Sequence, residues 1–166
     1  MRVGLGFDIH PYAEAGSYER SARRLVLGGV VFDGERPLAG HSDADVVAHA
    51  VTDALLGAAG LGDIGSHFPD TDPALAGADS MVLLTRAVAL VRDAGFEPGN
   101  VDCAVVLDAP KLAPHRDEME RRLGIAVGAD VTVKAKRPEG LGALGRGEGV
   151  ACWAVALVAL IEEHRS

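Results

Sequence analysis

The spacing of apolar residues along this chain switches between the two-residue period of strands and the longer period of helices. Four segments have strand-like spacing or short β-branched runs: 2–10, 25–31, 101–107 and 131–135. Four others have helical spacing: 43–60, 79–94, 114–127 and 148–163. Their order predicts an α/β fold, more closely an α+β two-layer sandwich in which helices cover one face of a four-stranded mixed sheet.

The core of such a fold has to be built from small aliphatic side chains. The chain has 166 residues and 48% hydrophobic content, which fits a single domain spanning 1–166. Aromatic residues make up only 4% while glycines number 21, so Ala, Val and Leu must fill the core. Because helices cover one sheet face only, we expect association of subunits to bury the other.

Charge and segment length exclude several classes of protein. The net charge of -8 argues against nucleic acid and against an anionic membrane, because both need a basic surface. The first residues form no apolar targeting segment, and the longest apolar run, 149–161, is too short to span a bilayer. We therefore expect a soluble cytoplasmic protein in which Cys103 and Cys152 are reduced core residues.

Acidic and imidazole side chains recur at spacings that suit a metal ion. Asp8 and His10 lie two apart on an expected strand, so both side chains leave the same face of the sheet. Taken alone, such a pair is more often structural and hydrogen-bonded than metal-binding. With one histidine from a facing helix it becomes a three-ligand set with an open fourth position; zinc fits this set best, while manganese and iron stay open.

The helix at 43–60 supplies that histidine. Polar residues recur there at every fourth position, in a stripe among Ala, Val and Leu that a core would not need: His41, Asp45, His49 and Asp53. Ser42 is the expected N-cap of this helix, with Asp45 as the acid of a capping box.

Three loops carry further candidate features. Acids and a hydroxyl in the two loops at 63–65 and 68–72 would suit a polyol, although ordinary turn chemistry explains the same residues. The glycine-rich run at 145–149, just before an expected helix, would let backbone N–H groups approach an anion. The polar segment 11–24 is expected to be a mobile loop with solvated Arg20, Arg23 and Arg24.

Motifs along nearly the whole chain resemble the 2-C-methyl-D-erythritol 2,4-cyclodiphosphate synthase family. The matching motifs stand in the family's order: Gly6-Phe7-Asp8-Ile9-His10, His41-Ser42-Asp43-Ala44-Asp45-Val46 with His49, Thr52-Asp53-Ala54-Leu55-Leu56-Gly57, Leu61-Gly62-Asp63-Ile64-Gly65, Phe68-Pro69-Asp70-Thr71-Asp72, Ala109-Pro110-Lys111 and Gly145-Arg146-Gly147-Glu148-Gly149. The resemblance implies a lyase of the non-mevalonate isoprenoid pathway, which closes a cyclic diphosphate and releases CMP.

The same resemblance implies a homotrimer whose sheets face the threefold axis, with each active site between neighbouring subunits. It implies Zn2+, or another divalent transition metal, at Asp8, His10 and His49. A Mg2+ or Mn2+ ion that bridges the substrate phosphates would be held by Glu139. The substrate's own phosphate is the nucleophile, so no side-chain nucleophile is expected.

Roles in substrate binding follow from the resemblance as well. His41 and Ser42 are expected to stabilise phosphate in the transition state. The erythritol portion is expected to contact two loops: Asp63, Ile64, Gly65, Phe68, Pro69, Asp70, Thr71 and Asp72. The cytidine diphosphate is expected on one turn: Leu107, Asp108, Ala109, Pro110, Lys111, Leu112 and Ala113.

The chain departs from the family after Lys134-Ala135. A Thr-rich run is usual there, but this chain reads Lys136-Arg137-Pro138-Glu139, so Arg137 takes the place of a phosphate-stabilising threonine. Ala143 stands where many relatives have an aromatic residue. Phe7, Arg146 and Glu148 match positions around the trimer axis, which makes an isoprenoid diphosphate an expected ligand of the central cavity.

Two other functions stay open at this point. The departures at Arg137, Pro138 and Ala143 would suit a trimeric metal-binding scaffold without turnover. A zinc phosphohydrolase would use the open metal position to activate water, but such chemistry usually brings a nearby general base that the matching motifs do not supply.

Overall fold

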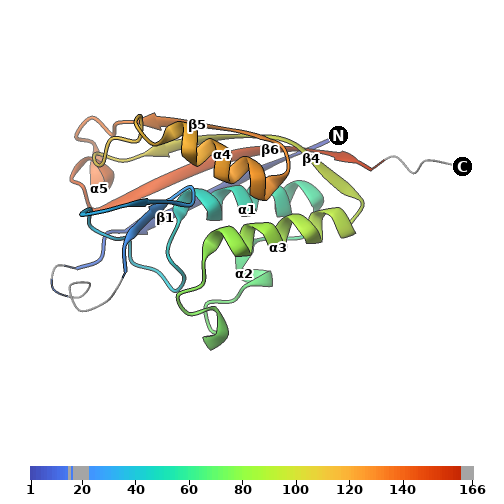
Figure 1. The fold of residues 1–166 in the computed structure, drawn as a ribbon, viewed down its shortest axis with the longest axis horizontal. Coiled ribbons are helices and arrows are strands. Elements are labelled where there is room, and N and C mark those ends of the chain that lie inside the picture. The colour runs from blue at the N-terminus through green and yellow to red at the C-terminus, as the bar shows by residue number, and fades with distance from the viewer. Residues whose placement is uncertain (15, 17–22, 162–166) are drawn as a thin grey trace, which may run out of the picture.

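The computed structural model describes residues 1–14, 16 and 23–161, which form a mixed four-stranded sheet, a small hairpin and a layer of helices (Figure 1). The strands are β1 (Arg2–Pro11), β2 (Leu25–Leu27), β3 (Val30–Phe32), β4 (Phe96–Val106), β5 (Asp130–Lys136) and β6 (Gly149–Leu160). The helices are α1 (Val46–Ala59), α2 (Ile64–His67), α3 (Ser80–Asp93), α4 (Arg116–Val127) and α5 (Gly142–Gly145), with a 3-10 turn η1 (Pro73–Leu75).

The large sheet has the strand order β1-β6-β4-β5. Strand β6 pairs antiparallel with both β1 and β4, while β5 runs parallel to β4. Helix α1 packs on β1 and β6, α4 packs on β5, and α3 lies beside α1 and α4. The predicted two-layer α/β fold with a mixed four-stranded sheet is confirmed (Figure 1).

One sheet strand was predicted wrongly as the closing helix 148–163. From Cys152 to Val155 burial alternates strictly, with Cys152 and Ala154 buried and Trp153 and Val155 exposed. The outward side chains are apolar as well, so no polar residue marks the two-residue period and the segment reads as a continuous apolar run. The glycine-rich run 145–149 therefore leads into a strand, and no helix N-terminus follows it.

The segment 25–31, predicted as a strand of the main sheet, is instead most of the separate hairpin β2–β3. Its turn is made by Gly28 and Gly29, both with positive φ (58° and 73°), a conformation that glycine adopts without steric cost. The predicted number of sheet strands was right because β6 replaces this segment.

Close packing between β1 and α1 positions the functional residues. A Cβ atom on Gly4 would lie 2.0 Å from the carbonyl oxygen of Ala54, and one on Gly6 would lie 1.9 Å from that of Ala50. Only glycine permits this approach. Since side chains alternate along a strand, Asp8 and His10 continue the same helix-facing row towards the start of α1.

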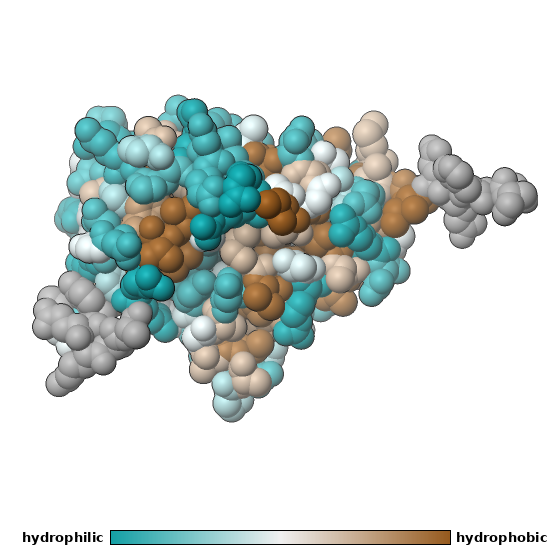
Figure 2. All heavy atoms as spheres, in the orientation of Figure 1, coloured by the Kyte–Doolittle hydropathy of each residue, from teal (hydrophilic) through white to brown (hydrophobic). Residues whose placement is uncertain are grey.

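The opposite side of the sheet carries exposed apolar side chains. We call these residues the outer sheet face: Val3, Leu5, Phe7, Ile9, Trp153 and Val155. The rings of Phe7 and Trp153 are in contact, tilted by 45° with their centroids 4.9 Å apart. By contrast, the surface seen in Figure 2, which looks onto α3 and α4, mixes hydrophilic and hydrophobic residues.

The N-cap of α1 is Asp45 rather than the predicted Ser42. The Asp45 carboxylate accepts hydrogen bonds from the backbone N–H groups of Val47 and Ala48 and from those of Gly28 and Gly29. This fully buried side chain therefore joins the β2–β3 hairpin to the start of α1. Cys103 and Cys152 are buried free thiols, as predicted. None of the helices in the described part of the chain is long and apolar enough to cross a membrane.

Candidate metal centre

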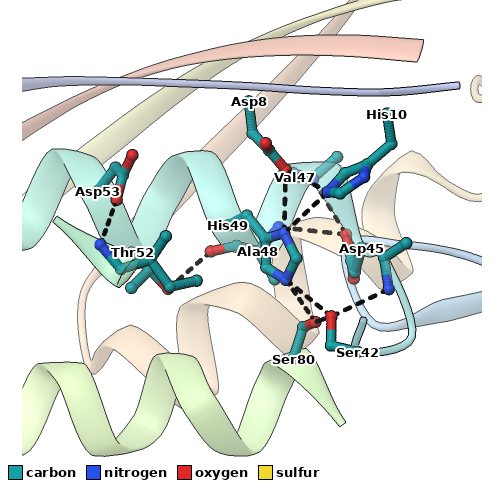
Figure 3. Close-up of polar contacts among 12 residues, drawn as sticks. Asp8, His10, Ser42, Asp45, Val47, Ala48, His49, Thr52, Asp53 and Ser80 are labelled. Atoms are coloured by element: carbon teal, nitrogen blue, oxygen red, sulfur yellow. Dashed lines mark hydrogen bonds and ion pairs between the residues drawn. The ribbon is translucent and has the colours of Figure 1, made fainter. Parts of the chain in front are cut away.

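Three side chains converge between β1 and the second turn of α1 (Figure 3). Asp8 Oδ2 lies 2.9 Å from His49 Nδ1 and 3.1 Å from His10 Nε2. The two histidine nitrogens are 3.3 Å apart. The sequence predicted that Asp8 and His10 pair and that a helix histidine joins them. The folded chain brings Asp8, His10 and His49 together.

The donor set fits a divalent transition metal. Three ligand atoms at these separations can all lie about 2.0–2.2 Å from one ion, the range for imidazole and carboxylate ligands of zinc. The Nδ1–H group of His10 donates to the carbonyl oxygen of Ala39 (2.9 Å), which directs Nε2 of His10 at the cluster. All three side chains are only partly buried, so an ion held there would keep a side open to a substrate.

Charge couples Asp8 and His10. Burial alone would raise the pKa of Asp8, but hydrogen bonds and charge interactions with His10 and His49 outweigh it and hold that pKa far below the ordinary value. Burial alone would lower the pKa of His10, but the carboxylate of Asp8 outweighs it and raises that pKa. A metal ion therefore has to displace a firmly held proton from His10.

The cluster lies in the wall of a cleft of about 490 Å³. Besides the three candidate ligands, predicted site residues line it: His41, Ser42, Ile64, Gly65, Phe68, Pro69 and Asp70. Gly40, Leu75 and Leu83 line it as well and were missed, because each reads as an ordinary turn or core residue. We call this space the metal cleft.

Three of the residues predicted to contact the erythritol portion do not line the metal cleft. Asp63 is the N-cap of α2 and accepts from the backbone N–H of Ser66, and Asp72 caps η1 through the N–H of Ala74. Turn chemistry thus accounts for both acids in this chain. Thr71 lies exposed between these turns.

The predicted polar stripe on α1 divides among three environments. Only His49 faces the metal cluster, whereas Asp45 caps the helix. Asp53 Oδ1 accepts from the backbone N–H of Ile64 at 2.7 Å and so holds the loop that forms one wall of the cleft. His41 precedes the helix and reaches the cleft from a loop.

A second cleft of about 320 Å³ lies between the start of α4 and the end of β5. Two residues of the predicted cytidine turn, Leu112 and Ala113, line it together with Lys136. It shares no lining residue with the metal cleft. In the turn itself the Ala109–Pro110 peptide is cis, and the Tyr12 hydroxyl donates to the carbonyl oxygen of Ala109 at 2.5 Å.

The segment after Lys136 lies apart from the metal cluster within this chain. Arg137 and Glu139 are exposed, and neither lines either cleft. Pro138 and Ala143 also line neither cleft. Arg146 forms an ion pair with Glu148 at 2.6 Å. Leu107 is buried, Asp108 and Lys111 are exposed, and none of the three lines the second cleft.

The arginines of segment 11–24 differ from one another. Arg23 was predicted to be solvated but donates to the backbone carbonyl oxygens of Leu38 and Gly40, at 3.3 and 2.7 Å. It therefore supports the turn before the metal cleft. Arg24 is exposed and lies 3.8 Å from Asp33, while Arg20 lies outside the described residues.

Comparison with known proteins gives one consistent family. The model of the YgbB family matches residues 1–159. The chain is 55% identical to the 2-C-methyl-D-erythritol 2,4-cyclodiphosphate synthase of Bordetella petrii, over 96% of both chains, and 53% identical to that of Ralstonia nicotianae, over 95% of this chain and 92% of the relative.

Solved structures agree with this assignment. The bifunctional IspDF of Campylobacter jejuni superposes with a TM-score of 0.88 at 40% identity, over 97% of this chain and 42% of the larger protein. The IspF–CDP complex of Plasmodium falciparum superposes with a TM-score of 0.80 at 30% identity, over 97% of both chains. This chain therefore belongs to the YgbB family, together with the 2-C-methyl-D-erythritol 2,4-cyclodiphosphate synthases.

Proposed function

We propose that this protein catalyses the metal-dependent cyclisation of 4-diphosphocytidyl-2-C-methyl-D-erythritol 2-phosphate. An oxygen of the 2-phosphate forms a bond to the β-phosphorus, the bond from that phosphorus to the bridging oxygen breaks, and CMP leaves with the electron pair. The products are 2-C-methyl-D-erythritol 2,4-cyclodiphosphate and CMP. We further propose that the chain acts as a single cytoplasmic domain of the non-mevalonate isoprenoid pathway.

The observation that carries this proposal is the position of the Asp8, His10 and His49 cluster in the wall of a cleft shared with predicted phosphate and polyol contacts. Family membership supports the reaction, since close relatives are synthases of this cyclic diphosphate. The reaction needs a folded substrate more than a reactive side chain, because nucleophile and leaving group belong to one molecule.

The residues of the proposed site divide the work of positioning. Asp8, His10 and His49 would hold zinc in the metal cleft. Glu139, which lines neither cleft within one chain, would hold magnesium or manganese with the substrate diphosphate, and the two ions would neutralise phosphate charge. His41 and Ser42 line the same cleft as the cluster and would hold phosphate oxygens in the transition state. Gly65 and Phe68 also line it and would enclose the erythritol portion.

We propose a homotrimer in which each active site combines two subunits. The outer sheet face supports association, because the contacting rings of Phe7 and Trp153, together with exposed Val3 and Leu5, would otherwise face water. The separation of the two clefts within one chain supports a shared site. A metal cleft from one subunit would then complete its substrate contacts with the cytidine turn and residues 136–139 of the next.

Arg137 is the proposed substitute for a short hydroxyl in phosphate stabilisation. Its exposed guanidinium is free to turn towards a phosphate of a neighbouring site, and its planar set of donors matches phosphate oxygens. Lys136 lines the second cleft and would neutralise the same diphosphate.

An isoprenoid diphosphate is the proposed ligand of the trimer axis. Phe7 belongs to the outer sheet face and Arg146 is exposed near the start of β6, so an apolar chain and a cation are both present. Binding should raise the melting temperature of the trimer in a titration with geranyl diphosphate. An unchanged melting temperature at saturating ligand would remove this ligand from the proposal.

Phosphorus NMR of zinc-loaded protein with the substrate and magnesium tests the reaction. We expect cyclic diphosphate and CMP to appear together in equal amounts. Inorganic phosphate without cyclic product would indicate a phosphohydrolase. An intact substrate with a zinc-loaded, assembled protein would indicate a metal-binding scaffold and would mean that Arg137 and Pro138 are not tolerated.

A further inference from the structure

We infer that Ser80 and Asp43 are positioning residues that select the tautomer of His49 in which Nδ1 is free to bind a metal. The inference rests on the proposed metal site. A histidine ligand binds through a nitrogen without a proton, so the proton of a neutral imidazole has to stay on the other nitrogen. In His49 the nitrogen facing Asp8 and His10 is Nδ1, and the proton therefore has to be held on Nε2.

Nε2 of His49 points away from Asp8 and His10, towards the hydroxyl groups of Ser42 and Ser80 (Figure 3). Ser80 Oγ lies 2.9 Å from Nε2 and Ser42 Oγ lies 3.1 Å from it. Ser80 is fully buried at the first position of α3, so no bulk water competes for its hydroxyl. Nothing about the serines alone decides whether they donate to Nε2 or accept from it, because a hydroxyl does both.

Asp43 determines which partner donates in the hydrogen bond between Ser80 and His49. The Ser80 hydroxyl donates a short hydrogen bond to Asp43 Oδ1, and the backbone N–H of Ser80 donates to Asp43 Oδ2 at 3.1 Å. An ionised carboxylate accepts hydrogen bonds only, so the single proton of Ser80 is committed to Asp43. The Ser80 oxygen can then only accept from Nε2–H, which leaves the Nδ1 lone pair for the metal.

Among the described residues, Ser42 has no carboxylate partner for its proton. Its oxygen accepts from the backbone N–H of Ala44 at 3.1 Å, and its other polar neighbours there are Nε2 of His49 and Ser80 Oγ. Because Nε2–H is directed at Ser80, the Ser42 proton does not have to satisfy His49. The Ser42 hydroxyl can donate to Ser80 Oγ, 3.3 Å away, or to a ligand in the metal cleft that Ser42 lines.

The tautomers of the two histidine ligands are thus fixed in different ways. Nδ1 of His10 faces a backbone carbonyl oxygen, which can only accept, so the fold itself fixes the tautomer of His10. The tautomer of His49 depends on a pair of side chains from the start of α3 and the loop before α1. Single substitutions at these side chains can therefore change the metal affinity without removing a ligand.

Replacement of Ser80 by Ala tests the inference on purified protein without substrate. Competition with a chromophoric chelator should show zinc binding weakened by about 10–100-fold, the usual effect of losing a partner of a ligating histidine. The helix cap is Asp79, so α3 keeps its N-terminal hydrogen bond. Thr85→Ala, which removes an exposed hydroxyl from the same helix, is the matched control and should bind zinc as wild type does.

In the metal-free protein Asp8 also accepts from Nδ1 of His49 at 2.9 Å, so the hydrogen bond of Nε2 is read with zinc bound. Proton and nitrogen NMR of histidine-labelled, zinc-loaded protein should show the Nε2–H of His49 protected from exchange with water, and Ser80→Ala should reduce this protection; His49→Gln identifies the signal. Asp43→Asn should also reduce it, because a neutral amide no longer commits the Ser80 proton. Ser80→Thr, which keeps the hydroxyl, should restore most of the zinc affinity.

Protection of the His49 Nε2–H that Ser80→Ala leaves unchanged, or zinc affinity in Ser80→Ala within twofold of wild type, would overturn the inference. Should Ser80→Ala fail to fold, Asp43→Asn and the wild-type NMR spectrum decide the question on their own. Zinc affinity and Nε2–H protection are read without substrate, so a protein that binds zinc in this way but forms no cyclic product would contradict the proposed function alone.

Discussion

The metal cleft and the segment 136–146 both belong to the expected active site, yet the chain builds them in opposite ways. Asp8, His10 and His49 stand on a strand and a helix that pack so closely that glycine is required between them. Arg137 and Glu139 are exposed on a loop, and Glu139 has a positive φ of 51°. One half of the site is set by the core of a single chain, and the other half has its functional side chains in solvent.

This difference indicates which half of the expected active site depends on subunit assembly. A cluster held by core packing keeps its geometry in any oligomeric state, because its supports are α1, β1 and the turn at Ala39. The exposed segment acquires a fixed position only when another surface meets it. The outer sheet face is the proposed means, because association of subunits would bury its apolar side chains. Metal binding and catalysis should therefore respond differently to substitutions.

The largest effect is expected for His49→Ala. Zinc binding should weaken by at least about 100-fold and turnover should disappear, because one of three ligands is lost. The oligomer should persist, since His49 is remote from the outer sheet face. Metal analysis and light scattering on the same sample check both statements, and full turnover by this variant would contradict the ligand assignment.

Leu5→Glu should affect assembly and turnover without affecting the metal ligands. Leu5 is 68% exposed in one chain, so the substitution leaves the folded subunit intact, but a carboxylate in an apolar interface costs several kcal/mol. Since each 1.4 kcal/mol is a tenfold change, association and turnover should fall by about 100-fold or more while zinc affinity stays near wild type.

Ile125→Glu is the matched control for Leu5→Glu, because Ile125 is 71% exposed on α4, away from the outer sheet face. It should leave the oligomer unchanged in light scattering. Equal loss of assembly in both variants would mean that the outer sheet face has no special role.

Glu139→Gln should raise the magnesium concentration needed for half-maximal turnover by some tens of fold, because the amide loses the charge that binds the ion. Zinc content should not change. A magnesium titration identical to that of wild type would remove Glu139 from the site, and a parallel loss of zinc would contradict the separation of the two halves.

The smallest expected effect is on the pH dependence of zinc binding. Asp8 raises the pKa of His10, so His10 keeps its proton to a pH above its ordinary value, and zinc has to displace that proton. Zinc affinity should rise by about tenfold per pH unit as the pH increases towards this raised pKa, and should level off above it. A flat profile from pH 6 to 8 would contradict the Asp8–His10 coupling.

In the metal-free protein the same pair should affect stability with the opposite sign. A raised pKa means that the folded state binds the proton more tightly than the unfolded state does. The contribution of His10 to the free energy of unfolding is therefore fully present below about pH 6.5 and lost as the pH rises through the raised pKa. Denaturant unfolding with chelator present measures it.

Whether the secondary structure of a segment could be predicted depended on the periodicity of its apolar residues. Strand β1 and helices α1, α3 and α4 were predicted because polar and apolar residues alternate in them. Strand β6 was missed because both of its faces are apolar, one towards α1 and the other towards the outer sheet face. A strand with apolar side chains on both faces carries no two-residue period in its sequence.

The same reasoning explains the site. Asp8 and His10 could be paired because a strand repeats every second residue, and His49 followed from a polar position in an apolar helix. Asp45 was misplaced because its partners, Gly28 and Gly29, come from a hairpin that local spacing does not bring to α1. Ser80 contacts His49 across 31 positions, a contact that only the packing of α3 on α1 creates.

Co-expression of two inactive variants tests most directly whether each active site joins the metal cleft of one subunit to residues 136–139 of another. One variant carries His49→Ala, the other carries Lys136→Ala with Glu139→Ala, and different tags allow mixed trimers alone to be purified. A shared site predicts one intact active site in every mixed trimer, hence turnover of about one third of wild type. If both halves of the site came from the same chain, mixed trimers would stay inactive, and that result would contradict the account.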